Sequence, residues 1–321
     1  MSFQRILTQT GKDGRLRKLY PFHISLEGME SVLLCRDDED YDHLQKSFYL
    51  SAWKMGCRVV SEIAMSNHGH VALLSSGIEQ ARRVGELIKK RHSQYISWKY
   101  GDSKLLKRSD ICVKYLDTDW YVRNALAYIP RNAVGTGGRV EDYRWSSYRG
   151  MFVAGRCPSG VRRVADLSSR ERERLFHSHE DLTGVPWVLN ADGNLEPVSA
   201  CDFQYLESAF NHDQAFYLKT IGSVNEAEMR QMLVLNGREK QADVEMQAII
   251  SRLAEKWYGK TILELSPEQK AHLLPYLYRC YRTTIPQLAR CLRMPRDLIA
   301  DLIPKRGHGG QQGSTPLQVE Q

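Results

Sequence analysis

The segment 65–70, Met-Ser-Asn-His-Gly-His, carries the sharpest chemical signal in the chain. His68 and His70 are two residues apart, and on a β-strand such residues project from the same face. Two imidazoles on one face suit a divalent cation. Histidines at this spacing also arise by chance in structural positions, so the pair needs support from other residues.

A second pair of residues, Tyr128 and Asn132, lies four apart in a segment of helical pattern. Four residues are about one helical turn, so both side chains share a helix face. A tyrosine hydroxyl and an amide oxygen could thus face a metal held by the two histidines. Taken singly, Tyr128 is typical of a half-buried aromatic residue and Asn132 of a helix C-terminus. The order of the two pairs along the chain is more informative than either pair.

Hydrophobic periodicity and turn residues predict the elements that would position these side chains. Strands are expected at 20–26, 58–65, 68–74 and 111–116, and helices at 37–55, 79–100 and 118–131. This order of elements is that of an α+β fold, a ferredoxin-like antiparallel sheet with helices on one face. A mostly α-helical C-terminal region follows.

Composition shifts along the chain predict four parts. Residues 1–152 form the catalytic-type domain, 153–224 an irregular connecting region, 225–304 a helical domain, and 305–321 a disordered tail rich in Gly and Gln.

Several motifs, taken in order, resemble those of the single-tyrosine HUH transposases of the insertion-sequence-200-like group. They are the MSNHGHVALL core of residues 65–74, the RHSQY end of the basic helix at 91–95, the stretch from Tyr128 to Asn132, and DYRWSSY at 142–148. The likeness is greatest to the REP-associated tyrosine transposases and covers about residues 20–152.

This resemblance implies metal-assisted DNA strand cleavage and rejoining through a 5′-phosphotyrosine. His68 and His70 match the metal-binding pair of the family, Tyr128 its nucleophile, and Asn132 the residue that completes the metal shell. Gly69 departs from the pattern, because a bulky apolar residue is usual there.

Two further departures follow Tyr128. The family has Asn-Pro-Val where this chain has Asn-Ala-Val at 132–134, and Pro130 lies close behind the tyrosine. A proline inside a helix removes one hydrogen bond and can kink the helix, which would re-aim Tyr128.

The implied chemistry agrees with the residue types. A free tyrosine has a pKa near 10, so its attack on phosphorus at neutral pH needs help in losing the proton. A divalent ion on His68, His70 and Asn132 would polarise the phosphate and neutralise charge on its oxygens. Mixed nitrogen and oxygen ligands suit Mn²⁺, and Mg²⁺ could serve although it prefers oxygen.

Basic residues supply the expected DNA contacts. The chain has 45 Lys and Arg against 38 Asp and Glu, a net charge of +7. Positive charge gathers between residues 82 and 108, beside the expected site, which favours phosphate contacts over a solvated helix face. Tyr95 and Trp98 lie among these charges, where they either stack on unpaired bases or belong to the core. The candidates here are Arg82, Arg83, Lys89, Lys90, Arg91, Lys107 and Arg108.

A helix-turn-helix pattern is present at 284–300. Ile285, Leu288, Leu292, Leu298 and Ile299 would pack around a turn, and Arg293 and Arg296 would then contact duplex DNA. A plain helical bundle explains the same pattern.

Composition excludes other classes of protein. Hydrophobic residues make up 42% and charged residues 26%, as in globular proteins. No apolar run approaches the ~20 residues of a membrane span. Seven cysteines without a CxxC pair are typical of reduced thiols in the cytoplasm.

The function expected is therefore that of a cytoplasmic, nucleoid-associated DNA transposase acting on single-stranded or hairpin DNA. The alternative is a DNA-binding regulatory protein that keeps the fold without efficient cleavage. A small-molecule metallohydrolase would leave the basic helix unexplained. The family contains both monomers and dimers, so a homodimer stays an open alternative.

Overall fold

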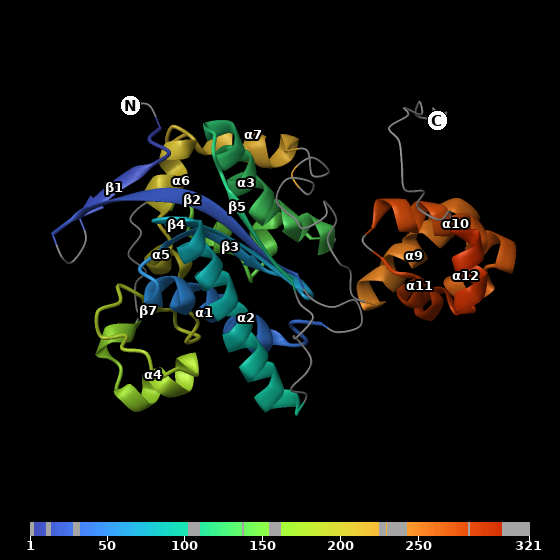
Figure 1. The fold of residues 1–321 in the computed structure, drawn as a ribbon, viewed down its shortest axis with the longest axis horizontal. Coiled ribbons are helices and arrows are strands. Elements are labelled where there is room, and N and C mark those ends of the chain that lie inside the picture. Colours follow the sequence, from blue (N-terminus) through green and yellow to red (C-terminus); the bar gives the residue numbers. More distant parts are fainter. Residues whose placement is uncertain are drawn as a thin grey trace. The chain divides into compact units, whose positions relative to one another are not determined.

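The structure is a computed structural model of the 321-residue chain, shown in Figure 1. It describes residues 3–10, 14–27, 33–101, 110–136, 138–153, 162–224, 229, 243–281 and 283–303. Two of the expected DNA contacts, Lys107 and Arg108, and the expected tail at 305–321 lie outside these residues. The chain divides into two compact units, Met1–Met246 and Gln247–Gln321.

An antiparallel sheet forms the centre of the first unit. Its strands are β1 (Leu7–Thr10), β2 (Leu16–Glu27), β3 (Arg58–Ala64), β4 (His68–Ser75) and β5 (Asp110–Tyr115). β2 pairs with β4 along one edge and with β5 along the other, and β3 pairs with β4. β1 pairs with the first residues of β2. The order β5-β2-β4-β3 confirms the α+β class and the ferredoxin-like sheet; β1 was not expected.

Three helices connect and follow these strands: α1 (Asp38–Lys54), α2 (Ile78–Tyr100) and α3 (Asp119–Arg131). The Asp37 side chain caps α1 by accepting from the Asp40 amide, and Thr118 caps α3 by accepting from the Tyr121 amide. α2 ends at Gly101, whose φ of 73° is readily adopted only by glycine. The helix boundaries lie within a residue or two of those predicted, because caps are local signals.

Alternate residues of β4 belong to two different cores. Val71 and Leu73 pack against α1 and α2, whereas Ala72 and Leu74 pack in the cluster that contains α3. α1 and α2 therefore cover one face of the sheet, whereas α3, which was expected on that same face, packs on the other. The opposite face is also covered by helices, α3 among them (Figure 1).

The segment expected as an irregular connection, 153–224, contributes to both cores. It contains β6 (Arg162–Arg163), α4 (Ser169–Phe176), β7 (Val188–Leu189), α5 (Pro197–Ala200), α6 (Phe203–Ala209) and α7 (Gln214–Ser223). Phe176 and Trp187 pack into the α1–α2 core, and Phe210 and Tyr217 into the α3 core. Because these elements are short, their sequence shows little periodicity, and their large aromatic residues are the signal that remains.

The second unit is helical. It holds most of α9 (Asp243–Tyr258), then α10 (Pro267–Cys280), α11 (Ile285–Leu292) and α12 (Arg296–Leu302). α11 and α12 are joined by three residues with Arg293 in the left-handed region at φ 53°. Leu288, Leu292 and Ile299 are buried, but Leu298 is 43% exposed and does not pack as expected. None of the described helices is both long and apolar enough to cross a bilayer.

Candidate active site

His68 and His70 begin strand β4 and point to the face of the sheet that α3 covers, since Ala72 and Leu74 belong to that core. Their ring centroids are 5.1 Å apart, and both residues are buried. The Nδ1 of His68 donates to the Asn67 Oδ1 at 2.7 Å, since an amide oxygen can only accept. In that neutral tautomer the lone pair is on Nε2, as a metal ligand requires.

Tyr128 lies on α3 beside these histidines. Its ring centroid is 5.5 Å from that of His70, in an edge-to-face arrangement, and the residue is only 1% exposed. α3 continues through Pro130 to Arg131. Pro130 therefore does not end the helix before the site, because its missing amide affects only the last turn.

Asn132 closes the C-terminus of α3. Its Nδ2 donates to the Tyr128 carbonyl at 2.9 Å and to the Ile129 carbonyl at 3.3 Å. The side-chain amide thus adds hydrogen bonds to two carbonyls at the end of α3 that also accept from the Asn132 backbone N–H. Only Oδ1 of this side chain could serve as a metal ligand.

Strand β2 adds three residues to the cluster that the sequence analysis did not assign. Ser25 is opposite His70 and Glu27 opposite His68 in the antiparallel register. His23, on the same face of β2, has its ring centroid 5.1 Å from that of His70. The signal was the alternation of polar residues at 23, 25 and 27 with apolar residues at 22, 24 and 26.

The fit of a metal ion can be judged from these donors. Within the described ranges, no three or more His, Cys, Asp or Glu side chains converge as a metal centre would require. An ion on His68 and His70 would therefore depend on amide, water or phosphate oxygens for its remaining ligands. Mn²⁺ and Mg²⁺ accept oxygen ligands of this kind.

Gly69 points to the opposite face of β4, toward α1. A Cβ at this position would lie 2.9 Å from the Cζ of Phe48, whose ring is buried in the α1–α2 core. Phe48 fills the space that a side chain on residue 69 would need. A bulky residue at position 69 would therefore require Phe48 to move.

The basic helix α2 does not lie beside the histidines, which corrects the expectation from sequence. Its apolar residues Ala81, Val84 and Ile88 pack on the α1 face, and the histidines are on the other face. β4 leads directly into α2, and the side on which α2 packs is decided by its apolar stripe and not by its charge.

The candidate DNA contacts on α2 differ from one another. Arg91 donates to Ser178 and forms an ion pair with Glu180 at 3.0 Å, so it has a structural role. Arg82 pairs with Glu79 at the surface, and Lys89 is half-buried. Arg83 and Lys90 are exposed.

The two aromatic residues of α2 also differ. Tyr95 is buried in the core, whereas Trp98 is 73% exposed.

In the second unit, Arg293 and Arg296 are exposed, but α12 also carries Asp297 and Asp301. The net charge of α12 is therefore negative, which opposes phosphate contacts along that helix.

The segment 142–148 packs against β3. The Tyr143 hydroxyl donates to the Ala64 carbonyl at 2.7 Å, and the Ser147 Oγ accepts from the Glu62 amide at 2.9 Å. These bonds hold the segment 142–148 against β3, although this segment is not a strand of the sheet.

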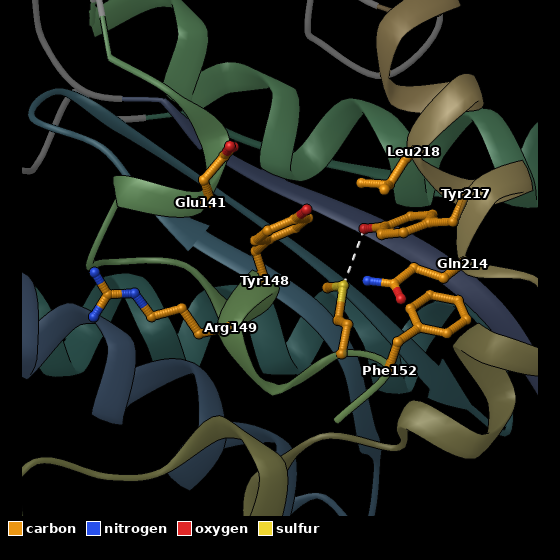
Figure 2. Close-up of a pocket in the computed structure, with 8 residues that line it drawn as sticks. Glu141, Tyr148, Arg149, Phe152, Gln214, Tyr217 and Leu218 are labelled. Atoms are coloured by element: carbon orange, nitrogen blue, oxygen red, sulfur yellow. Dashed lines mark hydrogen bonds between the residues drawn. The ribbon is translucent and has the colours of Figure 1, made fainter. Parts of the chain in front are cut away.

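A pocket of about 200 Å³ lies between this segment and α7 (Figure 2). The Tyr217 hydroxyl donates to the Met151 Sδ at 3.0 Å at its wall. Burial raises the pKa of Tyr217 and, together with Glu141, that of Tyr148, so neither hydroxyl is activated for attack. His68, His70 and Tyr128 do not line this pocket.

Comparison with known proteins gave one structural likeness. No family model and no curated protein sequence matches the chain. The chain is similar to a solved structure of a REP-associated tyrosine transposase bound to a REP hairpin, with 14% sequence identity and a TM-score of 0.31. The match covers 49% of this chain and 89% of the other.

Proposed function

We propose that the protein cleaves and rejoins DNA strands, as a transposase-like enzyme acting on single-stranded or hairpin DNA, with Tyr128 as the nucleophile. The observation that carries the proposal is the meeting of His68, His70 and Tyr128 on one face of the sheet. Residues from a strand and from a helix distant in sequence converge there, and the ring centroids of His70 and Tyr128 are 5.5 Å apart.

In the proposed step, the Tyr128 hydroxyl oxygen bonds to phosphorus as the bond from phosphorus to the 3′ oxygen breaks. The phenol proton is transferred over the step to that leaving oxygen, which becomes a free 3′-hydroxyl. The 5′-phosphotyrosine is itself a phosphodiester, because the bond to the tyrosine oxygen replaces the bond to the 3′ oxygen. Attack by a new 3′-hydroxyl can therefore rejoin the strand without ATP. A Mn²⁺ or Mg²⁺ ion held by His68, His70 and the Asn132 Oδ1 would neutralise charge on the phosphate oxygens.

Contacts with neighbouring residues orient the side chains of His68 and Tyr128. Asn67 holds His68 in the tautomer that presents Nε2. The fixed edge-to-face contact keeps the Tyr128 ring against His70. Burial of both residues excludes bulk water, which would otherwise compete with the rejoining hydroxyl for the phosphotyrosine.

The test is to trap a covalent protein–DNA adduct with labelled single-stranded and hairpin oligonucleotides in Mn²⁺. We expect Tyr128→Phe to abolish the adduct, because phenylalanine has no hydroxyl, while the ring still fills its place in the core. Mass spectrometry should place the DNA on the peptide that contains Tyr128. Tyr121→Phe is the matched control, because Tyr121 is also buried and lies seven residues earlier on α3. An adduct on another tyrosine would refute the assignment.

The burial of Tyr128 favours a second candidate function, a DNA-binding regulator that keeps the fold without cleaving DNA. With 1% of the residue exposed, a phosphate reaches its hydroxyl only if the covering residues move. Tight DNA binding by the wild-type protein without any adduct would support this second function over the first.

A further inference from the structure

A groove on the other face of the sheet has no part in the chemistry proposed above. It consists of two adjoining open pockets of about 460 and 360 Å³ between α1, the end of α2 and α4. Both pockets are lined by the same four aromatic residues, His43, Tyr95, Trp98 and His177. These four residues are called the aromatic groove below.

The rings of the aromatic groove are layered from the core outward. Tyr95 stacks on His43 with the centroids 3.9 Å apart and the planes 8° from parallel, and both residues are buried. Trp98 lies 6.1 Å from Tyr95 and 5.7 Å from His177, and it is 73% exposed. A large apolar ring left in water at the mouth of a groove is available to stack on a flat ligand.

A hydrogen-bonded chain of two histidines places an acceptor at the wall of this groove. The His92 Nε2 donates to the Leu34 carbonyl at 2.8 Å, so the His92 Nδ1 carries a lone pair. It accepts from the Nδ1 of His43 at 3.1 Å. The neutral His43 ring therefore has its own lone pair on Nε2.

Burial holds the pKa of His43 well below its usual range, and the second cause is the electrostatic repulsion that protonation of both His43 and His92 would bring. The ring consequently stays neutral at pH 7, and its Nε2 stays an acceptor. An anion, which offers only acceptors, finds no partner in this nitrogen. The groove instead suits a flat ligand with N–H groups on its edge.

Most charges along the groove are already paired. Lys46 bonds to Asp42 at 2.5 Å, and Arg162 to Glu171 at 2.8 Å. Arg174 also lines the groove, is exposed, and has no ion-pair partner in the part of the chain that the structure describes. This cation remains available for a phosphate group.

We propose that the aromatic groove binds an unpaired nucleobase of a DNA strand, stacked on Trp98, with an N–H group of the base edge donating to the His43 Nε2. A phosphate beside this base is neutralised by Arg174. This inference rests on the proposed function in taking DNA as the ligand. It adds a strand-binding site on the opposite face of the sheet from Tyr128.

The nucleobase is favoured by the combination of features. Stacking on an exposed aromatic ring and contact with nearby cations are the two usual elements of single-strand binding. A nucleobase also has the exocyclic or ring N–H donors that the neutral His43 accepts. Aliphatic side chains of a peptide would use neither the exposed ring face nor the free cation.

The proposal is tested by measuring the affinity of the full chain for a short single strand and for the same strand with one abasic position placed in turn along it. Trp98→Ala should weaken binding of the intact strand by about 5- to 100-fold, the usual effect of losing one stacked base. Trp98→Phe should restore most of the affinity. One abasic position should weaken binding to wild type and have no further effect on Trp98→Ala. Because Trp98 is exposed, the variants should fold.

Trp120→Ala is the matched control, since Trp120 is 49% exposed on α3, away from the groove, and its loss should leave affinity unchanged. Strands with 5-iodouracil at the sensitive position should photo-crosslink to the peptide that contains Trp98. Unchanged affinity of Trp98→Ala, or equal binding of all abasic strands to wild type, would overturn the proposal.

The two proposals fail separately. Crosslinking and affinity require no cleavage, so a crosslink at Trp98 without any adduct on Tyr128 would leave the groove standing and refute the enzyme. An adduct on Tyr128, together with unchanged affinity of Trp98→Ala, would support the enzyme and refute the groove.

Discussion

The two faces of the central sheet differ in how their side chains are arranged, although strand β4 contributes alternate residues to both faces. On the α3 face, His68, His70 and Tyr128 are closed off from solvent in a packed cluster. On the α1–α2 face, the aromatic groove is open and ends in the exposed Trp98. The basic helix α2 belongs to the open face (Figure 1).

This difference separates the groups that could do chemistry from those that could hold a strand. The closed face has the proposed nucleophile, Tyr128, and the proposed nitrogen ligands, His68 and His70, but lacks the basic helix. The open face has cations, a stacking ring and strongly shifted pKa values at His43, His92 and Glu62. The comparison teaches that a shifted pKa follows from burial of a titratable group. A shifted pKa therefore does not by itself identify the proposed nucleophile.

The largest expected effect is on the closed face. His68→Ala and His70→Ala should each lower adduct formation by about two orders of magnitude or more, because each removes a ligand of the ion that stabilises the transition state. DNA affinity should stay within about threefold of wild type in a binding assay run in parallel.

Trp98→Ala is the contrasting variant from the open face. It should weaken binding and leave the rate of adduct formation at saturating DNA unchanged. If it abolished the chemistry, or if the histidine variants cleaved DNA normally, the separation of the two faces would be wrong.

The next effect concerns stability on the α1–α2 side. Burial raises the pKa of Glu62 to about 8, although the Tyr49 hydroxyl and the Gln45 amide both donate to it. A raised folded-state pKa stabilises the fold below the unfolded pKa of about 4.5, and this contribution is lost as pH rises toward 8. Between pH 4.5 and 7, Glu62 alone should lower the free energy of unfolding by about 3 kcal/mol.

Glu62→Gln stays neutral, so it should lack this loss. Urea unfolding across that pH range would measure the difference between the two proteins. The control is Glu79→Gln, at an exposed carboxylate on α2, whose curve should run parallel to that of wild type. Parallel curves for Glu62→Gln would show that the carboxyl is ionised in the folded state.

A smaller effect is expected where β4 touches the α1–α2 core. Gly69→Ala should destabilise the fold by about 1–3 kcal/mol, because the added Cβ meets the buried ring of Phe48 at 2.9 Å. The double variant with Phe48→Leu should lose less than the sum of the two single changes.

Gly77→Ala is the control for this prediction, because nothing lies within 4 Å of the Cβ it would add. Denaturant midpoints would measure all four variants. Strict additivity of Gly69→Ala and Phe48→Leu would mean that the two positions do not compete for space.

The smallest effect concerns salt. Arg83→Gln and Lys90→Gln together should reduce the log–log slope of single-strand affinity against salt by up to about 1.4, since each phosphate contact contributes about 0.7. Arg91→Gln should leave this slope unchanged, because Glu180 already pairs with Arg91. A flattened slope for Arg91→Gln alone would show that this ion pair opens when DNA binds.

Sequence alone determined the local elements and the order of the fold. Hydrophobic periodicity and turn residues predicted α1, α2 and α3, and the spacing of His68 and His70 predicted their shared face. These signals are local, because caps and alternation act within one turn or one strand. The family motifs also singled out Tyr128, whose ring does lie beside His70.

Tertiary structure decided what faces what. Only the pairing of β2 with β4 brings His23 beside His70, and only the packing of α2 places its charges away from the tyrosine. The elements of 153–224 were hidden because short helices gain their stability from the cores they complete, as Phe176 and Tyr217 do, and little from their own periodicity. Contacts between residues distant in the chain depend on which apolar surfaces are buried together. Which surfaces these are is determined by the packing of the whole fold and not by any single segment.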